Sequence, residues 1–320
     1  MDQEKVTIGM TCYNSADTIG RAIQSALAQN YSNKEILIVD DGSSDESVGV
    51  ITQMISRNPE ARLIIHKENT GFAGALNTLI QEAQGKYLVI FDDDDVSVDH
   101  RVQTQLDRIL SYQKEFHTDM VVCHSARLQS YQDGSEFYEP TAGCVEGEAP
   151  HGVNMANRIL VGHLSKGVVG SCANCSRMAP VSAFKVIQGF DRNLRRCEDT
   201  DFNVRFALAG GHFVGIAEPL VIQTMTGGND KTLDREYAAE KMMIEKHKDY
   251  LSSIGWYSFC VAWQDVKYAN LSGQFREVFV KILFLLFRHP VQTLCKIGWA
   301  IPAKRTRSRL KSFYVMQGSR

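Results

Sequence analysis

The chain has 320 residues, of which 44% are hydrophobic and 22% are charged. This balance is that of an ordinary globular protein and excludes wholesale disorder, and the length fits one large α/β domain with an appended region. The formal net charge of -2 provides no overall attraction to nucleic acid, so we expect no nucleic-acid partner.

The start of the chain and its cysteines indicate the cellular compartment. Residues 1–5 are rich in charge and lead directly into an expected strand, so we expect no signal peptide and a cytoplasmic protein. The eight cysteines lack the spacing of a disulfide framework, and we expect reduced thiols. Cys172 and Cys175 form a CxxC pair without a second pair or suitably spaced histidines, so we expect them to be structural.

The first hundred residues alternate short apolar runs with segments whose apolar residues recur at helical spacing. The expected strands cover residues 6–10, 35–39, 63–65 and 87–91. Such alternation predicts a Rossmann-like α/β fold, with a mostly parallel central sheet and helices on both faces. Polar residues follow each strand, at the edge of the sheet where α/β proteins bind their ligands.

The fourth expected strand ends at four consecutive aspartates, Asp92 to Asp95. Carboxylates this close together repel one another unless a cation or hydrogen-bond donors compensate them. Mg²⁺ and Mn²⁺ prefer carboxylate oxygens and often bridge to substrate phosphates. Because no packing role explains four adjacent acids, we predict a metal site that presents a phosphorylated substrate.

The alternating pattern weakens after about residue 125. We predict a helix near 102–110, a strand near 120–123, no regular element in 129–170, a helix over 202–208, and short strands over 213–216 and 220–222. The acidic segment 198–201 comes just before the helix over 202–208. Taken alone, its carboxylates would equally fit first-turn charges that complement a helix dipole.

The last fifty residues differ in character from the rest. Residues 278–287 are almost wholly apolar, 291–303 are mostly apolar, and 304–311 contain five basic residues among eight. Ten residues cannot span a bilayer, which requires about 20. Apolar helices beside a basic cluster suit a surface helix among anionic headgroups, so we expect peripheral contact of 278–320 with the inner face of the cell membrane. The alternative is a helical cap packed on the main domain.

Five segments of the chain together resemble the family 2 glycosyltransferases, which are inverting enzymes of the GT-A fold. These segments are MTCYN (10–14), ILIVDDGSSDES (36–47), ENTGFAGALN (68–77), YLVIFDDDDVSVDHR (87–101) and GFDRNLRRCEDTDFNVRFALAGG (189–211). Their shared order and spacing over residues 5–222 is much more specific than any single motif. The resemblance implies a GT-A domain over 1–225, with a donor half to about 125 and an acceptor half over 126–225. A helical C-terminal region over 226–320 follows it.

The resemblance also implies roles for individual residues around the nucleotide. The residues that it places there are Thr11, Tyr13, Asp40, Asp41, Asn69, Gly71, Asp92 and Asp93. Thr11 and Tyr13 would line the base, and Asp41, with Asp40 beside it, would accept a base N–H. Asn69 and Gly71 belong to the loop that covers the nucleotide.

The metal and the catalytic base are implied in the same way. Asp92 to Asp94 match the DXD signature, in which the last aspartate binds the metal and the others approach the ribose. We expect Asp94 and Asp92 as ligands of Mn²⁺ or Mg²⁺, although four adjacent aspartates leave the register open by one position. Asp199, beside Glu198, matches the catalytic base. One departure is Leu76, where relatives often carry a basic residue.

The implied activity is transfer of a sugar from a nucleotide-diphosphate donor to a hydroxyl of a glycan or lipid-linked acceptor, as in surface polysaccharide synthesis. A UDP-sugar is the expected donor. A base must take the proton of the attacking hydroxyl, and attack from the face opposite the diphosphate inverts the anomeric centre. A bound divalent cation neutralises charge on the leaving diphosphate.

Two alternatives remain open at the level of sequence. Residues 91–96 also satisfy the nucleophile motif of haloacid-dehalogenase-type phosphohydrolases, with Asp92 as nucleophile. In that family the motif usually opens the domain, whereas here three strand–helix units precede it and no GDxxxD motif follows. The second alternative is a non-catalytic sugar-nucleotide-binding protein, against which the presence of both Asp199 and the DXD signature argues.

Overall fold

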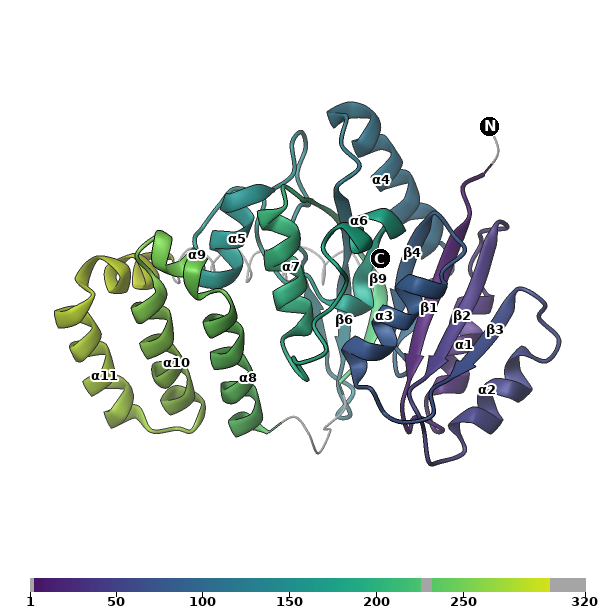
Figure 1. Cartoon of the computed structure of the whole chain (residues 1–320), viewed down its shortest axis with the longest axis horizontal. Helices are drawn as coiled ribbons and strands as arrows, with labels where there is room; N and C mark the ends of the chain where they lie inside the picture. Colours follow the sequence, from purple (N-terminus) through teal and green to yellow (C-terminus); the bar gives the residue numbers. More distant parts are fainter. Residues whose placement is uncertain (1–2, 226–231, 300–320) are drawn as a thin grey trace.

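The computed structural model describes residues 3–225 and 232–299. Its N-terminal half contains four parallel strands in the order β3-β2-β1-β4 (Figure 1). They are β1 (Val6–Cys12), β2 (Lys34–Asp40), β3 (Ala61–Ile65) and β4 (Tyr87–Phe91). The four strands predicted from the apolar runs are therefore confirmed, and their carboxyl ends share one edge of the sheet.

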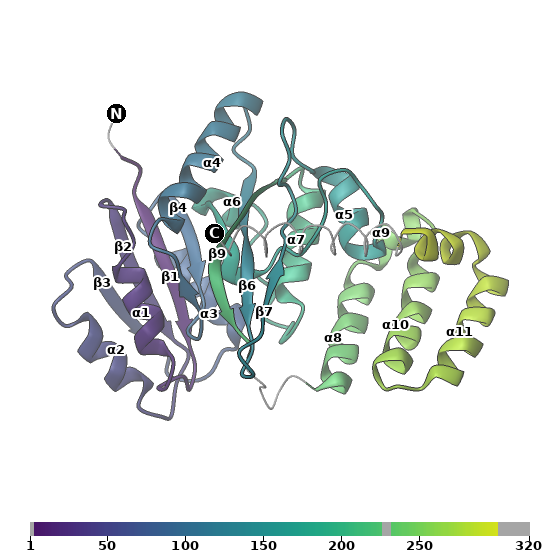
Figure 2. The same ribbon diagram turned by 180° about the vertical axis from the view of Figure 1, so that it is seen from behind.

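Helices cover both faces of this sheet, as Figures 1 and 2 show from opposite sides. One face carries α1 (Ile19–Leu27), α2 (Ser47–Ile55) and α4 (Arg101–Phe116), and the other carries α3 (Phe72–Glu82), α6 (Val181–Val186) and α7 (Glu198–Leu208). Successive strand residues point to opposite faces. Val89 thus packs with the first set of helices, whereas Leu88 and Ile90 pack with the second. Burial on both faces explains why the strands read as continuous apolar runs.

The second half of the sheet mixes strand directions. It adds β8 (Arg177–Pro180), β6 (Val121–Ser130), β9 (His212–Thr224) and β5 (Val96–Ser97) beyond β4, and β7 (Glu136–Glu139) pairs with β6. β8 is antiparallel to both β4 and β6, so β6 and its parallel neighbour β9 run in the same direction as β4. The two short strands predicted over 213–216 and 220–222 are one strand, β9.

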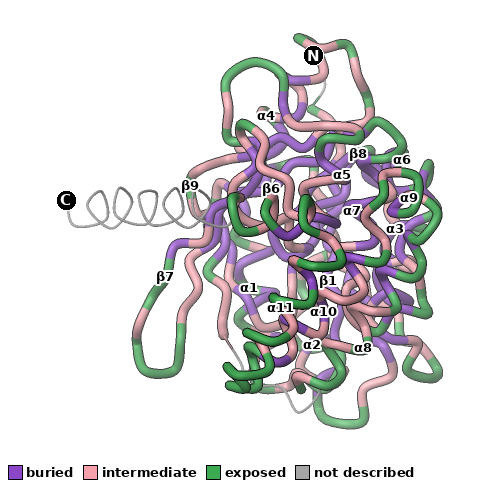
Figure 3. The backbone as a smooth tube through the Cα atoms, turned by 90° about the vertical axis from the view of Figure 1, so that its left-hand side faces the viewer, coloured by how far each residue is buried: buried purple, intermediate pink, exposed green. Residues whose placement is uncertain are grey.

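The prediction of no regular element in 129–170 is wrong. This segment contains β7 and a helix, α5 (Gly152–Val161), which Gly162 ends in a left-handed conformation with φ of 77°. Figure 3 shows the β6–β7 hairpin projecting from the body with an exposed tip. Strand β7 is only four residues long, and its order depends on pairing with β6, which local periodicity does not report.

The C-terminal region is a set of helices packed beside α5 and α7 (Figure 1). It consists of α8 (Leu233–Lys246), α9 (Lys248–Ser253), α10 (Tyr257–Leu271), α11 (Phe275–Arg288) and a helical stretch over 290–299. Leu160 of α5 and Val204 of α7 share an apolar cluster with Phe259 and Leu285. No helix within the described ranges combines the length and the hydropathy that crossing a membrane requires. The basic run 304–311 lies outside the described residues.

Candidate active site

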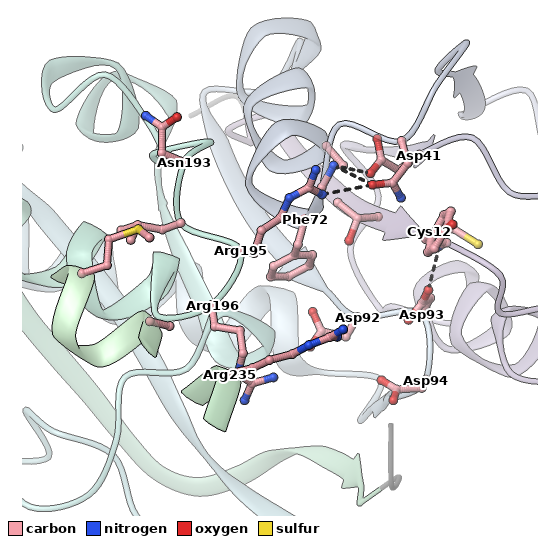
Figure 4. Close-up of a pocket in the computed structure, with 18 of the residues that line it drawn as sticks. Cys12, Asp41, Phe72, Asp92, Asp93, Asp94, Asn193, Arg195, Arg196 and Arg235 are labelled. Carbon is pink, nitrogen blue, oxygen red and sulfur yellow. Dashed lines mark hydrogen bonds between the residues drawn. The ribbon is translucent and has the colours of Figure 1, made fainter. Parts of the chain in front are cut away.

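A cavity of about 640 Å³ lies at the carboxyl ends of β1, β2 and β4 (Figure 4). The sequence-predicted residues that line it are Thr11, Tyr13, Asp41, Asn69, Gly71, Asp92, Asp93 and Asp94. Its opposite wall comes from the segment before α7 and from α8. Most of the residues singled out in separate parts of the sequence therefore meet in one place.

The turn after β1 is fixed by the acidic run. Asp93 accepts hydrogen bonds from the Tyr13 backbone N–H at 3.3 Å and from the Ser15 hydroxyl at 2.6 Å. The Tyr13 side chain is 49% exposed. An exposed aromatic ring beside a cavity is not a packing residue, so it is available to stack on a flat ligand group.

Asp41 and Asp40 have different environments although they are neighbours. Asp41 lines the cavity, and its carboxylate accepts hydrogen bonds from the backbone N–H groups of Thr70, at 2.9 Å, and Gly71, at 2.8 Å. It therefore fixes the loop after β3 against the end of β2. Asp40 is fully buried, does not line the cavity, and accepts hydrogen bonds from the backbone N–H and hydroxyl of Ser43. Its position is that of a turn cap, because successive strand side chains point to opposite faces.

Gly71 has a backbone that suits glycine alone. Its φ is +81°, and a Cβ at this position would lie 2.5 Å from Nη1 of Arg195. The same guanidinium donates to the Asn69 side chain at 3.1 Å. The loop predicted to cover a nucleotide is thus held in contact with a cation from the distant segment before α7.

The carboxyls at the end of β4 are compensated poorly. Burial, and then the neighbouring Asp95 and Asp94, raise the pKa of Asp92 well above its usual value. Burial likewise raises the pKa of Asp93 to about 6, against the opposing effect of its hydrogen bond from Ser15. Among the described residues, Oδ1 of Asp92 is buried without a hydrogen-bond partner. An orphaned carboxylate oxygen among further carboxylates is the donor set that a hard divalent cation requires, so the residues fit Mg²⁺ or Mn²⁺.

The last two aspartates of the run separate. Asp94 lines the cavity, whereas Asp95 is buried, does not line it, and accepts a hydrogen bond from the Thr224 backbone N–H at 2.9 Å. Burial and the Asp94 charge raise the pKa of Asp95 to about 6. Ligand atoms of Asp92, Asp95 and Cys175 lie within 4.8 Å of one another, but burial raises the pKa of Cys175, so this thiol stays protonated. The structure thus places Asp94 on the cavity side and Asp95 on the protein side.

Glu198 and Asp199 begin α7, close to the cavity wall but outside its lining residues. A short 3₁₀ turn, η1 (Asn174–Ser176), connects the two acidic regions. The Asn174 amide donates to Glu198 at 3.4 Å, and the next residue, Cys175, contacts the group of Asp92 and Asp95 described above. The helix start and the end of β4 therefore lie on either side of one three-residue turn.

Glu198 is a carboxyl with a raised pKa of about 7, caused by burial and then by the Asp199 charge. Behind it lies Arg177, which is fully buried and donates to the side chains of Asn174 and Asn203. The Asp199 and Glu198 charges favour the protonated guanidinium, but burial is larger and lowers the pKa of Arg177 to about 10. A carboxyl that titrates near neutral pH is suited to proton exchange.

Asp201 belongs to a different arrangement from its two neighbours. Its carboxylate contacts Arg205 at 2.8 Å, Lys246 at 2.9 Å and His247 at 3.0 Å. These partners outweigh burial and lower the pKa of Asp201 to about 2. Lys246 is the last residue of α8 and His247 follows it, so these contacts join the C-terminal region to α7.

Three arginines in the cavity wall were not predicted as site residues. Arg195 and Arg196 precede α7, and Arg235 comes from the first turn of α8. Figure 4 shows Arg195 reaching towards the loop beside Asp41, while Arg196 and Arg235 lie closer to Asp92. The adjacent Arg195 and Arg196 could have been noticed as candidate site residues, because they lie in the segment 189–211 that resembles the family. The residues next to Arg235 in the sequence do not indicate that it reaches the site. Leu76, which occupies a position that is often basic in relatives, is buried in the core. The basic charge in this cavity therefore comes from the three arginines of other elements.

Comparisons with known proteins agree with this geometry. The model of the family described as "Glycosyl transferase family 2" matches residues 7–185, which is more than half of the chain. A succinoglycan biosynthesis protein, ExoO, of Rhizobium meliloti is 39% identical over 32% of this chain and 29% of its own length. WfaP of Escherichia coli, a UDP-Glc:alpha-D-GlcNAc-diphosphoundecaprenol beta-1,3-glucosyltransferase, is 37% identical over 32% of this chain and 40% of its own length. The match thus spans less than half the length of either curated relative.

Solved structures show the same fold over almost the whole chain. TarS of Staphylococcus aureus, residues 1–349 with UDP-GlcNAc, has a TM-score of 0.58 at 15% identity and covers 98% of this chain and 92% of that one. The mannosyltransferase PcManGT of Pyrobaculum calidifontis, with GDP-Man and Mn²⁺, has a TM-score of 0.53 at 16% identity and covers 98% and 86%. At this identity the likeness establishes the fold alone. With the family model matching over residues 7–185, the chain belongs to glycosyl transferase family 2.

Proposed function

We propose that the protein is a metal-dependent, inverting glycosyltransferase that moves a sugar from a nucleotide-diphosphate donor to a hydroxyl of a glycan or lipid-linked acceptor. The observation that carries this proposal is the single cavity that joins the ends of β1, β2 and β4 to three arginines from later elements. Family membership favours this reaction over phosphohydrolysis at Asp92. The donor in our proposal is a UDP-sugar, the class of ligand present with TarS.

The nucleoside would lie on the β1 and β2 side of the cavity. Thr11 and the exposed Tyr13 ring offer a surface for the base, and Asp41 offers an acceptor for a base N–H. Asp41 already accepts backbone N–H groups of Thr70 and Gly71, so it also positions the loop that would cover the nucleotide. Asp93, fixed by Ser15, would approach the ribose.

Asp94 and Asp92 would hold Mn²⁺ or Mg²⁺. Asp94 lines the cavity, and the buried, partnerless oxygen of Asp92 supplies a second hard ligand. When bound, the cation neutralises negative charge as it develops on the leaving diphosphate. Arg195, Arg196 and Arg235 would contribute further positive charge at the same place, because planar guanidinium groups pair well with phosphate oxygens.

Asp199 would act as the base. It follows Glu198 at the start of α7, and η1 links Glu198 to the acidic end of β4, so an acceptor hydroxyl bound beside these carboxyls could reach the donor's anomeric carbon. Asp199 then takes the hydroxyl proton during attack from the face opposite the diphosphate, which inverts the anomeric centre. Glu198, with its raised pKa of about 7, would supply a neighbouring site through which that proton can leave.

The proposed acceptor class follows from the wall opposite the nucleotide and from the relatives. Ala238, Ala239 and Met242 of α8 line this wall, and their small or flexible apolar side chains leave room for a glycan or a lipid-linked sugar. WfaP is named for a diphosphoundecaprenol-linked acceptor and ExoO for succinoglycan biosynthesis. We therefore place this protein in surface polysaccharide synthesis.

A lipid-linked acceptor requires the enzyme to meet a membrane, and one face of the C-terminal region suits this contact. Apolar side chains between 41% and 90% exposed cover the outer face of α11 and the stretch 290–299, namely Phe275, Phe279, Val280, Leu283, Phe284, Phe287, Val291, Leu294 and Ile297. Arg276 and Arg288 lie at the two ends of α11. An apolar helix face beside basic residues is the composition of a helix that lies among anionic headgroups. We propose the inner face of the cell membrane as its partner.

Substitution tests the membrane contact more cleanly than deletion, because Leu285 of α11 belongs to the core. Changing Phe279, Phe284 and Phe287 together to glutamine should lower partitioning into anionic liposomes by at least tenfold, since each buried Phe is worth about 1.5–3 kcal/mol. Val186→Gln on α6, where the side chain is 62% exposed, is the matched control and should partition as the native protein does. Equal partitioning of the triple variant would rule out the membrane contact.

Donor binding and turnover test the main proposal directly. A thermal-shift screen of nucleotide sugars should show a stabilising UDP-sugar whose effect requires Mn²⁺ or Mg²⁺, and this donor should be consumed when a lipid-linked glycan is added. Trapping of a phosphoaspartate analogue at Asp92 would instead support the phosphohydrolase alternative. Binding of a sugar nucleotide without turnover on any acceptor would support the non-catalytic alternative.

A further inference from the structure

Two histidines and a glutamate gather at the opposite edge of the sheet from the catalytic cavity. His212 is the first residue of β9 and pairs with Val121 at the start of β6. Because β6 and β9 run in the direction of β4, this edge is remote from the end of β4 that carries the aspartates. His151 is the residue just before α5 and forms a β-bridge with His212, and Glu148 lies three residues before it.

The three side chains are close enough to share one ion. One ligand atom from each of Glu148, His151 and His212 lies within 4.8 Å of the others. Two groups of side chains within the described residues are close enough to bind a metal ion. This one contains two imidazoles, whereas the group of Asp92, Asp95 and Cys175 contains none. Imidazole nitrogens suit zinc and similar transition metals, while carboxylate oxygens suit magnesium and manganese. The two sites would therefore select different ions.

A tyrosine supports one of the candidate ligands from behind. The Tyr112 hydroxyl lies 2.8 Å from Nδ1 of His212 and accepts a hydrogen bond from the Ala149 backbone N–H at 2.9 Å. Tyr112 is fully buried on α4. An ion bound at Nε2 of His212 would leave the proton on Nδ1, which would then donate to the Tyr112 oxygen, and this is the support that metal-binding histidines usually have.

The surroundings of Glu148 and His212 favour a ligand role over a structural ion pair. Burial, and then the neighbouring His151, lower the pKa of His212, which favours the neutral imidazole that binds a metal ion. The Glu148 carboxylate is 57% exposed, and its nearest contact to His151 Nδ1 is 3.8 Å. Among the described residues, the Glu148 carboxylate is therefore not committed to a close ion pair.

The ring geometry shows which side chain has to move. The His151 and His212 rings are stacked, with centroids 4.3 Å apart and planes 10° apart. An ion must lie near the plane of each ring that binds it, so two stacked rings cannot share one as they stand. The His151 side chain is 41% exposed, and its Nδ1 contacts the Ala149 carbonyl, at 3.1 Å, and Glu148, so the ring has room to turn towards solvent.

We propose that Glu148, His151 and His212 form a second metal site that binds Zn²⁺, with the His151 ring turned out of the stack. Three protein ligands of the types N, N and O leave a fourth position for water. The bound ion would fasten the segment before α5 to the start of β9 and, through Tyr112, to α4. Its role is therefore to stabilise the fold of the acceptor half, and it does not depend on the proposed glycosyl transfer.

Calorimetric titration of Zn²⁺ into the full-length chain tests the site, with excess Mg²⁺ present to occupy the carboxylate site. We expect one Zn²⁺ per chain in addition to any bound by the aspartates, and a rise in melting temperature of about 3 °C or more at saturation. His151→Ala and Glu148→Gln should each weaken this binding at least tenfold. Tyr112→Phe should weaken it about tenfold, because it removes the support and leaves the ligands.

Two controls keep the result specific. His117→Asn removes an exposed histidine elsewhere, in a left-handed conformation that asparagine tolerates, and should bind Zn²⁺ as the native chain does. In histidine-ring NMR spectra, Zn²⁺ should shift the resonances of His151 and His212 and leave those of His117 in place. Native-like Zn²⁺ affinity in both His151→Ala and Glu148→Gln, absence of Zn²⁺ binding by the native chain, or shifts at other histidines alone would overturn the proposal.

Discussion

The two acidic segments of this protein look alike in sequence but differ in what compensates their charge. At the end of β4, Asp92 has a buried oxygen with no hydrogen-bond partner in the part of the chain that the structure describes, and burial raises the pKa values of Asp92, Asp93 and Asp95. At the start of α7, Asp201 contacts Arg205, Lys246 and His247 and has a pKa lowered to about 2. Uncompensated carboxylates are suited to binding a cation, and fully paired ones hold helices together.

The same contrast divides the second segment internally. Glu198, next to Asp199, contacts η1, whereas Asp201, two residues beyond Asp199, contacts Arg205 and α8. A helix turns by about 100° per residue, so neighbouring acids face different surroundings. Substitutions that remove one carboxylate at a time therefore separate chemistry from stability.

The largest effect is expected for Asp199→Asn. The variant keeps the shape of the side chain but cannot accept the proton of the acceptor hydroxyl, so transfer should fall by about 10²–10⁴-fold. UDP-sugar affinity, measured by calorimetry, should stay within a factor of about two, because Asp199 does not line the cavity. Retained turnover would remove Asp199 from the role of base.

A comparable loss is expected for Asp94→Ala, but with a different signature. Removing an electrostatic stabiliser of the leaving group should lower turnover by about 10²–10³-fold. In contrast to Asp199→Asn, the Mn²⁺-dependent part of nucleotide-diphosphate binding should also disappear. Asp107→Asn, on the outer face of α4, is the control and should bind donor and metal normally. Unchanged manganese dependence in Asp94→Ala would contradict the assignment.

Asp201→Asn should destabilise the fold without touching the chemistry directly. Lowering the carboxyl pKa from 3.8 to about 2 corresponds to about 2 kcal/mol of stability at neutral pH. Because the folded pKa lies below the unfolded one, this stability is present above pH 3.8 and is lost as the pH falls towards 2. Urea denaturation should therefore show a difference of about 2 kcal/mol at pH 7 that shrinks at pH 3. A constant difference would argue against the ion-pair group.

Glu198→Gln should have the smallest effect on stability. Its pH dependence should run in the opposite direction to that of Asp201→Asn. The folded pKa of Glu198 is raised to about 7 from 4.5, so its stabilising contribution is complete below pH 4.5 and is lost as the pH rises through 7. The melting temperature of the native chain should therefore decline between pH 5 and 8 more steeply than that of Glu198→Gln. Parallel melting profiles would show that Glu198 does not titrate in this range.

Much of the N-terminal half could be predicted from the sequence because its information is local. The run from Tyr87 to Phe91 identifies a buried strand, and the aspartates after it identify a ligand-binding edge. The helix α5 was missed although Met155, Ala156 and Leu160 have helical spacing, because polar and glycine-rich segments surround it. Strand β7 left no comparable trace, since it depends on its partner β6.

The sequence by itself therefore determined the fold class, the family and the edge of the sheet where the site lies. Only the tertiary structure decided that Asp41 lines the cavity while Asp40 caps a turn, and that Arg235 and Arg195 line the same cavity. It also decided that His151 and His212 lie together at the other edge. Periodicity and strand ends depend on neighbours along the chain, whereas these arrangements depend on sheet register and on helix packing between distant segments.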